Sequence, residues 1–242
     1  SASLALAGPP EAIEKITGTL NAEFGGFRSG TVATPLSKAE PRWSQPHSER
    51  LLEYPLPTGG ISLELLFPGP AIGDSDIPLA RMTSLILTGS GAARLNYRLR
   101  EQDSLVYAVT SGIAPYRDFG YLQIKTDAED NRYLGQIMRA IKEELDDLAT
   151  HGPSEVEMNM ARALAWTSDR VAIGNDQEIA ERMLWSARLT GKVVLPQEDA
   201  LTLQEITPSK ISKFVGSILN RGLIVATGNV EPGMVDGKIF FG

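Results

Sequence analysis

Residues 85–109 have the sequence LILTGSGAARLNYRLREQDSLVYAV, and the predicted organisation of the chain is clearest around this stretch. An apolar helical run ends at Gly89-Ser90-Gly91, because closely spaced glycines interrupt a helix. A second short helix follows, and two of its leucines lie four residues apart on one face. The chain then enters a strand at residues 104–113, where side chains around Tyr107 alternate between two faces. The stretch therefore predicts a helix, a tight turn, a short helix and a half-buried strand.

Further strands and helices are predicted on both sides of this stretch. Two strands precede it, at residues 50–56 and 61–67, and the turn signal Pro-Thr-Gly-Gly separates them. The second half of the chain is mainly helical, because its apolar residues recur three or four positions apart. The remaining elements are helices near 76–87, 127–151, 154–170, 176–190 and 208–219, and strands at 120–125 and 223–227. This order predicts an α+β fold, with a mostly antiparallel sheet and helices packed on one face.

Three helix starts carry capping residues. Asp127 is a candidate N-cap for the helix that ends at His151-Gly152. Ser154 with Glu157 three residues later forms a capping-box signature. Thr207 precedes Pro208, which suits the first position of a helix.

The first 49 residues predict less structure. A short strand at Leu4–Ala7 and a helix at Glu11–Leu20 are too little to form a domain alone. Residues 29–49 have the Pro-, Ser- and Thr-rich composition of a linker. We therefore divide the chain at residues 28 and 49, and place the main domain at residues 50–242.

The composition excludes several classes of partner and chemistry. The net charge of −7 and the lack of a Lys/Arg cluster argue against nucleic acid binding. The chain has no cysteine, which excludes disulfides and thiolate metal sites. No apolar run approaches the length of a membrane span, and Ser1–Gly8 lacks the features of a signal peptide. The sequence leaves open whether the chain works in the periplasm or the cytoplasm of a bacterium.

The sequence carries no complete metal or nucleophile motif. The two histidines are His47, in the proline-rich stretch, and His151, at a predicted helix C-terminus. A catalytic zinc site commonly needs several histidines, and no His-x-x-Glu-His motif is present. No Gly-x-Ser-x-Gly elbow occurs either. We therefore predict no metal ligand and no catalytic residue in this chain.

Two other patterns have ordinary structural interpretations. The run Gly89-Ser90-Gly91 resembles half of a dinucleotide fingerprint, but Arg94 occupies the position of the third glycine. We therefore predict a tight turn between helices and no cofactor. The carboxylates Glu143, Glu144, Asp146 and Asp147 form an acidic run, which is usually a solvated helix face.

Arg100 and Tyr107 are the candidate functional pair, although position alone favours ordinary roles. An arginine near a helix C-terminus commonly interacts with the helix dipole, and a tyrosine in a strand commonly packs. Their surroundings carry a resemblance to one family. Residues 85–109 are similar to the pitrilysin/insulinase/mitochondrial-processing-type zinc peptidases, in which a Gly-rich turn precedes Arg-Leu, then Leu-Arg-Glu, then Leu-x-Tyr. Asp103-Ser104 departs from the pattern, since Gly or a basic residue is more usual there.

The similarity extends over roughly residues 50–230. Phe119-Gly120 leads into a strand, Pro153-Ser154-Glu155-Val156-Glu157 begins a helix, and Glu205–Ile211 precedes the final helix in the same order. The opening, with Phe24-Gly25 after a helix, resembles the end of a homologous domain. The resemblance thus implies that residues 1–28 are the tail of a preceding domain and that residues 50–242 are the C-terminal, accessory domain.

Members of this family enclose a peptide between two homologous domains. One domain carries a His-x-x-Glu-His zinc helix and the other carries an Arg/Tyr pair, which Arg100 and Tyr107 match in spacing. The resemblance implies that this chain binds a peptide substrate, holds no zinc, and pairs with a zinc-bearing domain or subunit. It also implies a second possibility, because the superfamily includes inactive structural core subunits of respiratory complexes.

Overall fold

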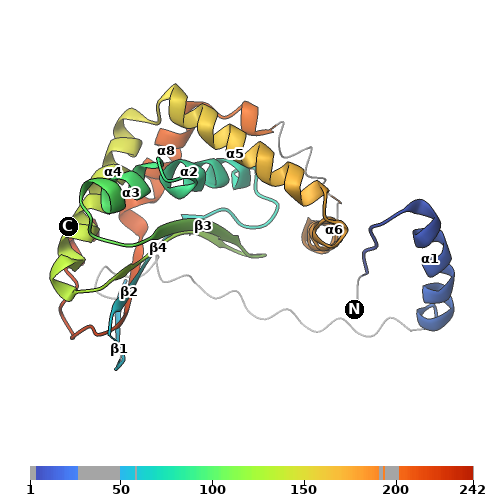
Figure 1. The fold of residues 1–242 in the computed structure, drawn as a ribbon, viewed down its shortest axis with the longest axis horizontal. Coiled ribbons are helices and arrows are strands. Elements are labelled where there is room, and N and C mark those ends of the chain that lie inside the picture. Colours follow the sequence, from blue (N-terminus) through green and yellow to red (C-terminus); the bar gives the residue numbers. More distant parts are fainter. Residues whose placement is uncertain (1–3, 27–49, 58, 191–192, 194–201, 242) are drawn as a thin grey trace. The chain divides into compact units, whose positions relative to one another are not determined.

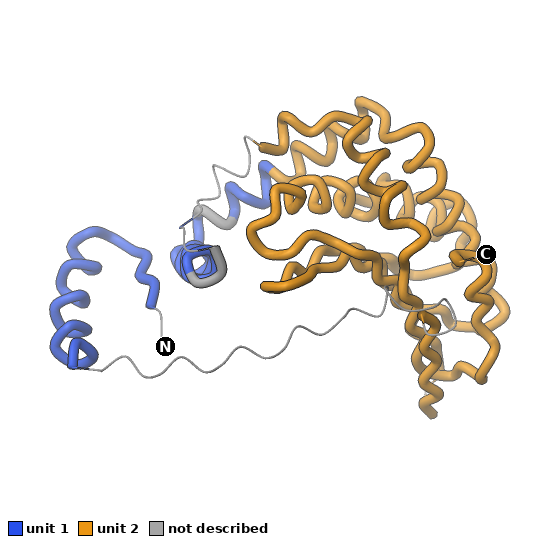
Figure 2. Tube along the Cα trace, turned by 180° about the vertical axis from the view of Figure 1, so that it is seen from behind, with its two compact units in different colours: residues 1–39, 166–201 blue, residues 40–165, 202–242 orange. Residues whose placement is uncertain are grey.

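A computed structural model of the chain describes residues 4–26, 50–57, 59–190, 193 and 202–241. The chain divides into two compact units, which Figure 2 shows in different colours. The smaller unit comprises residues 1–39 and 166–201, and the larger comprises residues 40–165 and 202–242.

The larger unit is built on a five-stranded sheet of order β1-β5-β2-β4-β3. The pairs β2–β4, β2–β5 and β3–β4 are antiparallel, whereas β1 pairs with β5 in parallel. The strands are β1 (Leu51–Pro55), β2 (Ile61–Gly69), β3 (Val109–Pro115), β4 (Gly120–Ala128) and β5 (Leu223–Gly228). The predicted mostly antiparallel sheet is confirmed.

Alternation along the strands separates a buried face of the sheet from an open one. In β2, every second residue from Ile61 to Phe67 is at most 2% exposed, and the residues between them are intermediate. The pattern repeats in β4, where Leu122 and Ile124 are buried and Lys125 is exposed. Period-2 burial of this kind is expected where helices cover one face only. Figure 1 shows α2, α4 and α8 on the same side of the sheet.

The helices that cover the sheet supply the other half of the core. The apolar face of α4 buries seven residues, from Leu134 to Leu148, and packs against α8. The helices of this unit are α2 (Ile77–Thr88), α3 (Arg94–Asn96), the π-helix η3 (Tyr97–Gln102), the 3-10 turn η4 (Asn131–Tyr133), α4 (Leu134–His151), α8 (Pro208–Ile218), the 3-10 turn η5 (Leu219–Arg221) and α9 (Lys238–Phe241). The boundary between the two units falls inside α5 (Glu155–Ile173). The α+β class with helices on one sheet face is therefore confirmed.

Two of the three predicted helix caps are confirmed. Ser154 N donates to Glu157 Oε2 at 2.7 Å, and Glu157 N donates to Ser154 Oγ at 3.3 Å, which together form a capping box. Thr207 Oγ1 accepts from the backbone N of Lys210 at 3.4 Å. The prediction for Asp127 is wrong, because this residue lies in β4. The helical turns begin instead after Asp130, whose side chain accepts from the backbone N of Arg132.

The smaller unit contains α1 (Pro10–Phe24), α6 (Asp176–Thr190) and the end of α5. Residues 4–7 form no strand, contrary to the prediction. A strand is stabilised by hydrogen bonds to a partner strand, and residues 4–7 have none among the described residues. The predicted linker, residues 29–49, lies outside the described residues, as does His47. None of the described helices combines the length and the hydropathy that crossing a bilayer requires.

Candidate functional site

The segment that carries the candidate pair is joined to α2 by a tight turn. Asn96 Nδ2 donates to the backbone oxygens of Thr88 and Ser90, both at 3.0 Å. The first bond satisfies a carbonyl group at the C-terminus of α2 that has no partner inside the helix, and the second fixes the turn that follows. The predicted tight turn between two helices at Gly89-Ser90-Gly91 is therefore present, and α3 and η3 form the second helical piece.

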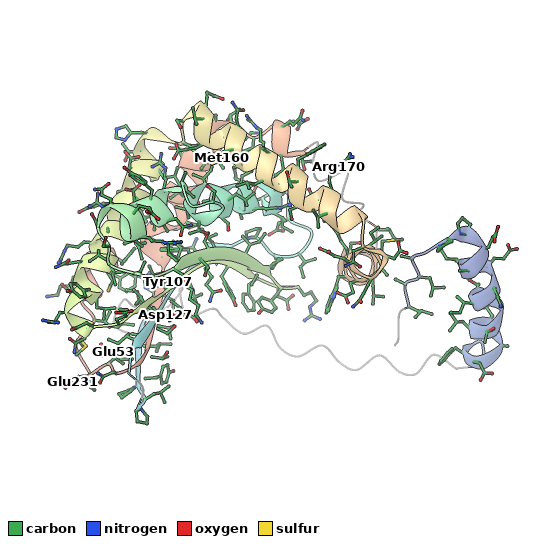
Figure 3. The ribbon with its side chains drawn as sticks, viewed as in Figure 1. Glu53, Tyr107, Asp127, Met160, Arg170 and Glu231 are labelled. Carbon is green, nitrogen blue, oxygen red and sulfur yellow. The ribbon has the colours of Figure 1, made fainter. Side chains whose placement is uncertain are left out.

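The structure brings Arg100 and Tyr107 together on the surface. Arg100 lies in η3, and its guanidinium carbon is 5.8 Å from the centre of the Tyr107 ring, within the range of a cation–π contact. The Arg100 side chain is 50% exposed and Tyr107 is 84% exposed. Arg100 Nε lies 3.6 Å from Glu101 Oε1, which is a long ion pair. Figure 3 labels Tyr107 on the chain that leads into the sheet.

Tyr107 does not lie inside a strand, which corrects the prediction of a strand from residue 104. The strand β3 begins at Val109. The backbone N of Leu105 donates to Leu99 O at 2.8 Å, which holds the loop against the end of η3. Thr126 Oγ1 donates to Ala108 O, which fixes the other end of the loop to β4. The alternation of residues 104–108 therefore reflects a short loop with one buried side chain, Val106, and not a pleated strand.

Two backbone features mark this loop as unusual. Ser104 has a φ of 52°, the only positive φ of a residue other than glycine in the described part of the chain. An L-residue in this left-handed region is uncommon, whereas glycine adopts it readily. This explains why glycine suits the position in the family pattern. The helix η3 is a π-helix, a rare form that often occurs at functional sites.

The acidic run on α4 is partly solvated, since Glu143 and Asp147 are exposed, but it also pairs with two arginines. Arg94 and Arg98 both approach α4, where they pair with Asp147 and Glu143 at 2.6 and 3.0 Å. Burial raises the pKa of Glu144, which lies 3.9 Å from Arg94. Neither arginine was predicted to have a partner or a role. Their spacing of four residues, which puts both on one helix face, was the available signal.

No group of described residues has the composition of a metal site. His151 is 73% exposed, and its Nδ1 lies 2.8 Å from Asp147 Oδ1. Within the described ranges, no cluster of three or more His, Cys, Asp or Glu side chains could hold a metal ion.

The chemistry that the pair itself offers is hydrogen-bond donation. A guanidinium presents five N–H donors and a phenol presents one O–H donor, and these suit a carbonyl or carboxylate oxygen. A nearby hollow of about 360 Å³, lined by residues that include Arg98, Asp103 and Glu143, does not include Arg100 or Tyr107. The pair thus faces outward on an open surface and not into that hollow.

Comparison with known proteins identifies the family. A family model described as "Peptidase M16 inactive domain" matches residues 3–164, which is more than half of the chain. No curated protein sequence matches the chain.

Solved structures share the fold at low sequence identity. The peptidase M16 inactive domain from Pseudomonas fluorescens is 20% identical with a TM-score of 0.66, over 75% of this chain and 44% of that one. A protease from Helicobacter pylori is 11% identical with a TM-score of 0.76, over 89% of this chain and 52% of that one. A chain of complex III2 from Candida albicans, with Inz-5 bound, is 16% identical with a TM-score of 0.69, over 78% and 47%.

The chain spans about half the length of these matched structures. The resemblance found in the sequence and the fold found in the structure agree with the family match. The chain belongs to the peptidase M16 inactive-domain family.

Proposed function

We propose that this chain is the non-catalytic, substrate-binding half of a zinc-dependent metalloendopeptidase, and that Arg100 and Tyr107 bind the peptide. The zinc site would lie on a homologous domain or subunit that carries His-x-x-Glu-His. The observation that carries this proposal is the exposed Arg100–Tyr107 pair, with 5.8 Å between guanidinium and ring. Residues in sparsely populated backbone regions, such as Ser104 in this loop, cluster at functional sites.

The role proposed for the pair follows from its donors. In a zinc peptidase the metal supplies an activated water. The carbonyl oxygen of the scissile bond gains negative charge during the attack, and a positioned donor stabilises that charge. Arg100 and Tyr107 are both able to donate to such an oxygen, because the ion pair of Arg100 with Glu101 is made through Nε, at 3.6 Å, and not through its Nη groups.

The open position of the pair supports a site shared with another domain. A peptide held only by two exposed side chains would keep most of its own surface in water, so a second wall is needed. A homologous domain facing Arg100 and Tyr107 would supply it. This chain covers only 44% and 52% of two of the matched structures, so their remaining length has room for such a domain.

We also propose that residues 1–28 are the tail of that preceding domain, with residues 29–49 as the linker. The helix α1 has no buried residue, and Leu4, Ile16 and Phe24 are 67%, 48% and 59% exposed. Apolar side chains exposed in this way are expected on a piece whose packing partner lies outside the chain.

The test is peptide cleavage by the assembled protein, purified with whatever domain or subunit accompanies it. We expect Arg100→Ala to lower kcat/KM by about 10² or more, the usual cost of losing one oxyanion donor, and Tyr107→Phe to lower it less. A matched control exists at Arg132, whose guanidinium lies 5.9 Å from the Tyr133 ring. Arg132→Ala should leave cleavage unchanged. Normal cleavage by the Arg100→Ala protein would refute the assignment of the pair.

A second candidate is an inactive structural subunit of the same superfamily. The fold similarity to a chain of complex III2 favours it. The two candidates predict different proteins bound to the native protein when it is purified. An intact mass about twice that of this chain, or a bound His-x-x-Glu-His partner, supports the peptidase. Co-purification with subunits of a respiratory complex supports the structural role.

A further inference from the structure

Three sides of the segment that carries Arg100 have different environments. Leu95 and Leu99 are 0% exposed and anchor the segment in the core. Arg94 and Arg98 face α4, and Arg100 faces solvent. The segment comprises a three-residue helix and a six-residue π-helix, and helices this short are unstable without tertiary contacts. The position of Arg100 therefore depends on what holds the segment.

Arg94 makes the densest set of polar contacts on this segment. Its Nη1 lies 2.6 Å from Asp147 Oδ2, and its Nη2 lies 3.2 Å from Glu157 Oε2. The Nε of Arg94 bonds the other oxygen of Glu157, so the two side chains form a bidentate pair. The Nη2 also donates to Gly152 O at 3.3 Å. With a side chain only 13% exposed, Arg94 is enclosed by these groups.

The charges of Arg94, Asp147 and Glu157, which together we call the Arg94 junction, favour a fixed geometry. Burial works against the charge of Arg94, but hydrogen bonds to Glu157 and Asp147 outweigh it and raise the arginine pKa. Burial likewise opposes the charge of Glu157, and the bonds from Arg94 and Ser154 still lower its pKa. The hydrogen bond from Arg94 is the main cause of the lowered pKa of Asp147. Both carboxylates are thus ionised partners of the guanidinium at neutral pH.

Arg94 connects three elements through one side chain. Asp147 is on α4, and Gly152 follows the end of that helix. Glu157 is also the capping-box residue of α5, because it accepts from the N and Oγ of Ser154. The segment that begins at Arg94 is therefore tied both to the end of α4 and to the start of α5.

We propose that Arg94 is a positioning residue for Arg100: by clamping the start of the segment to α4 and α5, it holds the Arg100–Tyr107 pair in place. The clamp itself rests on the contacts above, and only its effect on cleavage rests on the proposed function. Arg94 is enclosed by carboxylates and so is not itself presented to a substrate. A displacement of about 1 Å at a binding group can cost about 10²-fold in rate, so a distant clamp can control activity.

The first experiment measures amide hydrogen exchange of the assembled protein with Arg94→Met. We expect exchange in residues 95–107 to be faster by about tenfold or more, the factor that matches the loss of one charge-assisted hydrogen bond from local opening. Residues 120–128 of β4 should exchange as in the wild type. Lys142→Met is the control, because it removes an ion pair of 2.6 Å to Asp146 on the same helix α4. Unchanged exchange of residues 95–107 in a folded Arg94→Met protein would overturn the proposal.

The second experiment is a double-mutant cycle on kcat/KM with Arg94→Met and Arg100→Ala. If Arg94 acts through Arg100, the loss caused by Arg94→Met, about tenfold or more, should vanish in the Arg100→Ala background. Additive losses would show that Arg94 acts through general stability, and would overturn the positioning role. Arg94→Lys keeps the charge without the bidentate fork, should give an intermediate loss, and serves the cycle if Arg94→Met does not fold.

The two experiments separate failure of the clamp from failure of the proposed function. Normal cleavage by the Arg100→Ala protein refutes the functional site. The exchange measurement then decides by itself whether Arg94 holds residues 95–107: faster exchange supports the clamp and wild-type exchange overturns it.

Discussion

Arg94 and Arg100 lie six residues apart on one helical segment, yet their surroundings are opposite. Arg94 is 13% exposed and bonds two carboxylates and a carbonyl, whereas Arg100 is 50% exposed and has one long ion pair. A guanidinium with all its directions occupied stabilises the fold, and one with donors still directed to solvent is able to bind a ligand. One short segment is thus anchored in the fold on its inner side and exposed on its outer side, where we propose that the peptide binds.

The same division extends along the segment into the loop. On the inner side, Leu99 and Val106 are buried in the core. On the outer side, Tyr97 and Tyr107 are 57% and 84% exposed. Stability should therefore respond to changes on the inner side and cleavage to changes on the outer side. The predictions below test that separation.

The largest effect on stability is expected at Leu99. Leu99→Ala removes a side chain that is 0% exposed and leaves a cavity in the core, which should lower the free energy of unfolding by about 2–5 kcal/mol. The adjacent Arg100→Ala should change it by no more than about 0.5 kcal/mol, as is usual for an exposed position. Urea unfolding of the two variants measures both values. Equal losses would contradict the division into an inner and an outer side.

The next effect is expected at Glu157, where the capping box and the Arg94 clamp meet. Glu157→Ala removes both interactions and should cost about 1–3 kcal/mol of unfolding free energy. Glu155 lies in the same first turn of α5 and is exposed, so Glu155→Ala is the control and should cost no more than about 0.5 kcal/mol. Thermal unfolding of the two variants makes the comparison. A loss of stability at Glu155 as large as the one at Glu157 would contradict the prediction that the bonds of Glu157 to Ser154 and Arg94 stabilise the fold.

The junction should also make the protein sensitive to acid. The pKa of Glu157 lies below its ordinary value of 4.5, so its stabilising contribution is complete above about pH 4.5 and is lost as the pH falls through the lowered pKa. Asp147 acts with the same sign. Glu144, whose pKa burial raises, acts with the opposite sign and offsets part of the loss.

Glu157→Gln tests this dependence because it removes one of the titrating carboxylates. We expect the Tm of the wild type to fall more than that of Glu157→Gln between about pH 5 and about pH 3. The absolute Tm of the variant at neutral pH should be the lower of the two, since an amide cannot replace the charge-assisted bonds to Arg94. Parallel falls in Tm would mean that Glu157 has the same pKa in the folded and unfolded chain.

The sequence predicted the parts of the fold in which local pattern and packing agree. The strand predicted at residues 61–67 and the apolar face of residues 134–148 correspond to β2 and to the buried face of α4. The strand predicted from residue 104 was wrong, because the alternation of residues 104–108 belongs to a loop that turns at Ser104. The helix N-cap predicted at Asp127 was also wrong, because β4 continues through this residue, which pairs with Ser62.

The candidate site was predictable only in part. Arg100 and Tyr107 were found through the family pattern, and the structure places them 5.8 Å apart, measured from the guanidinium to the ring centre. Arg98 pairs locally with Asp103, but the other acidic partners of Arg94 and Arg98 lie 45 to 63 residues away along the chain. A contact over that separation leaves no periodic signal in a single sequence, which is why the arginine partners of the acidic run were not predicted.

The smallest effect is expected at Ser104, on the outer side of the segment. A left-handed φ costs a residue other than glycine about 1–2 kcal/mol, and Ser104→Gly should relieve that strain. Glycine also has more conformational freedom in the unfolded chain, which lowers the unfolding free energy by about 0.5–1 kcal/mol. The two effects leave a net gain of about 0.5–1 kcal/mol in unfolding free energy, which chemical denaturation is able to measure.

Ser75→Gly is the matched control for this last prediction. Ser75 is an exposed turn residue without a positive φ, so glycine there should destabilise the protein by about 0.5–1 kcal/mol through the unfolded chain alone. The two serine substitutions should therefore have opposite signs. If Ser104→Gly destabilised the protein as Ser75→Gly does, the loop before Tyr107 would not be strained. The exposure of Arg100 and Tyr107 would then be the feature that distinguishes the outer side of the segment, and backbone strain would not be.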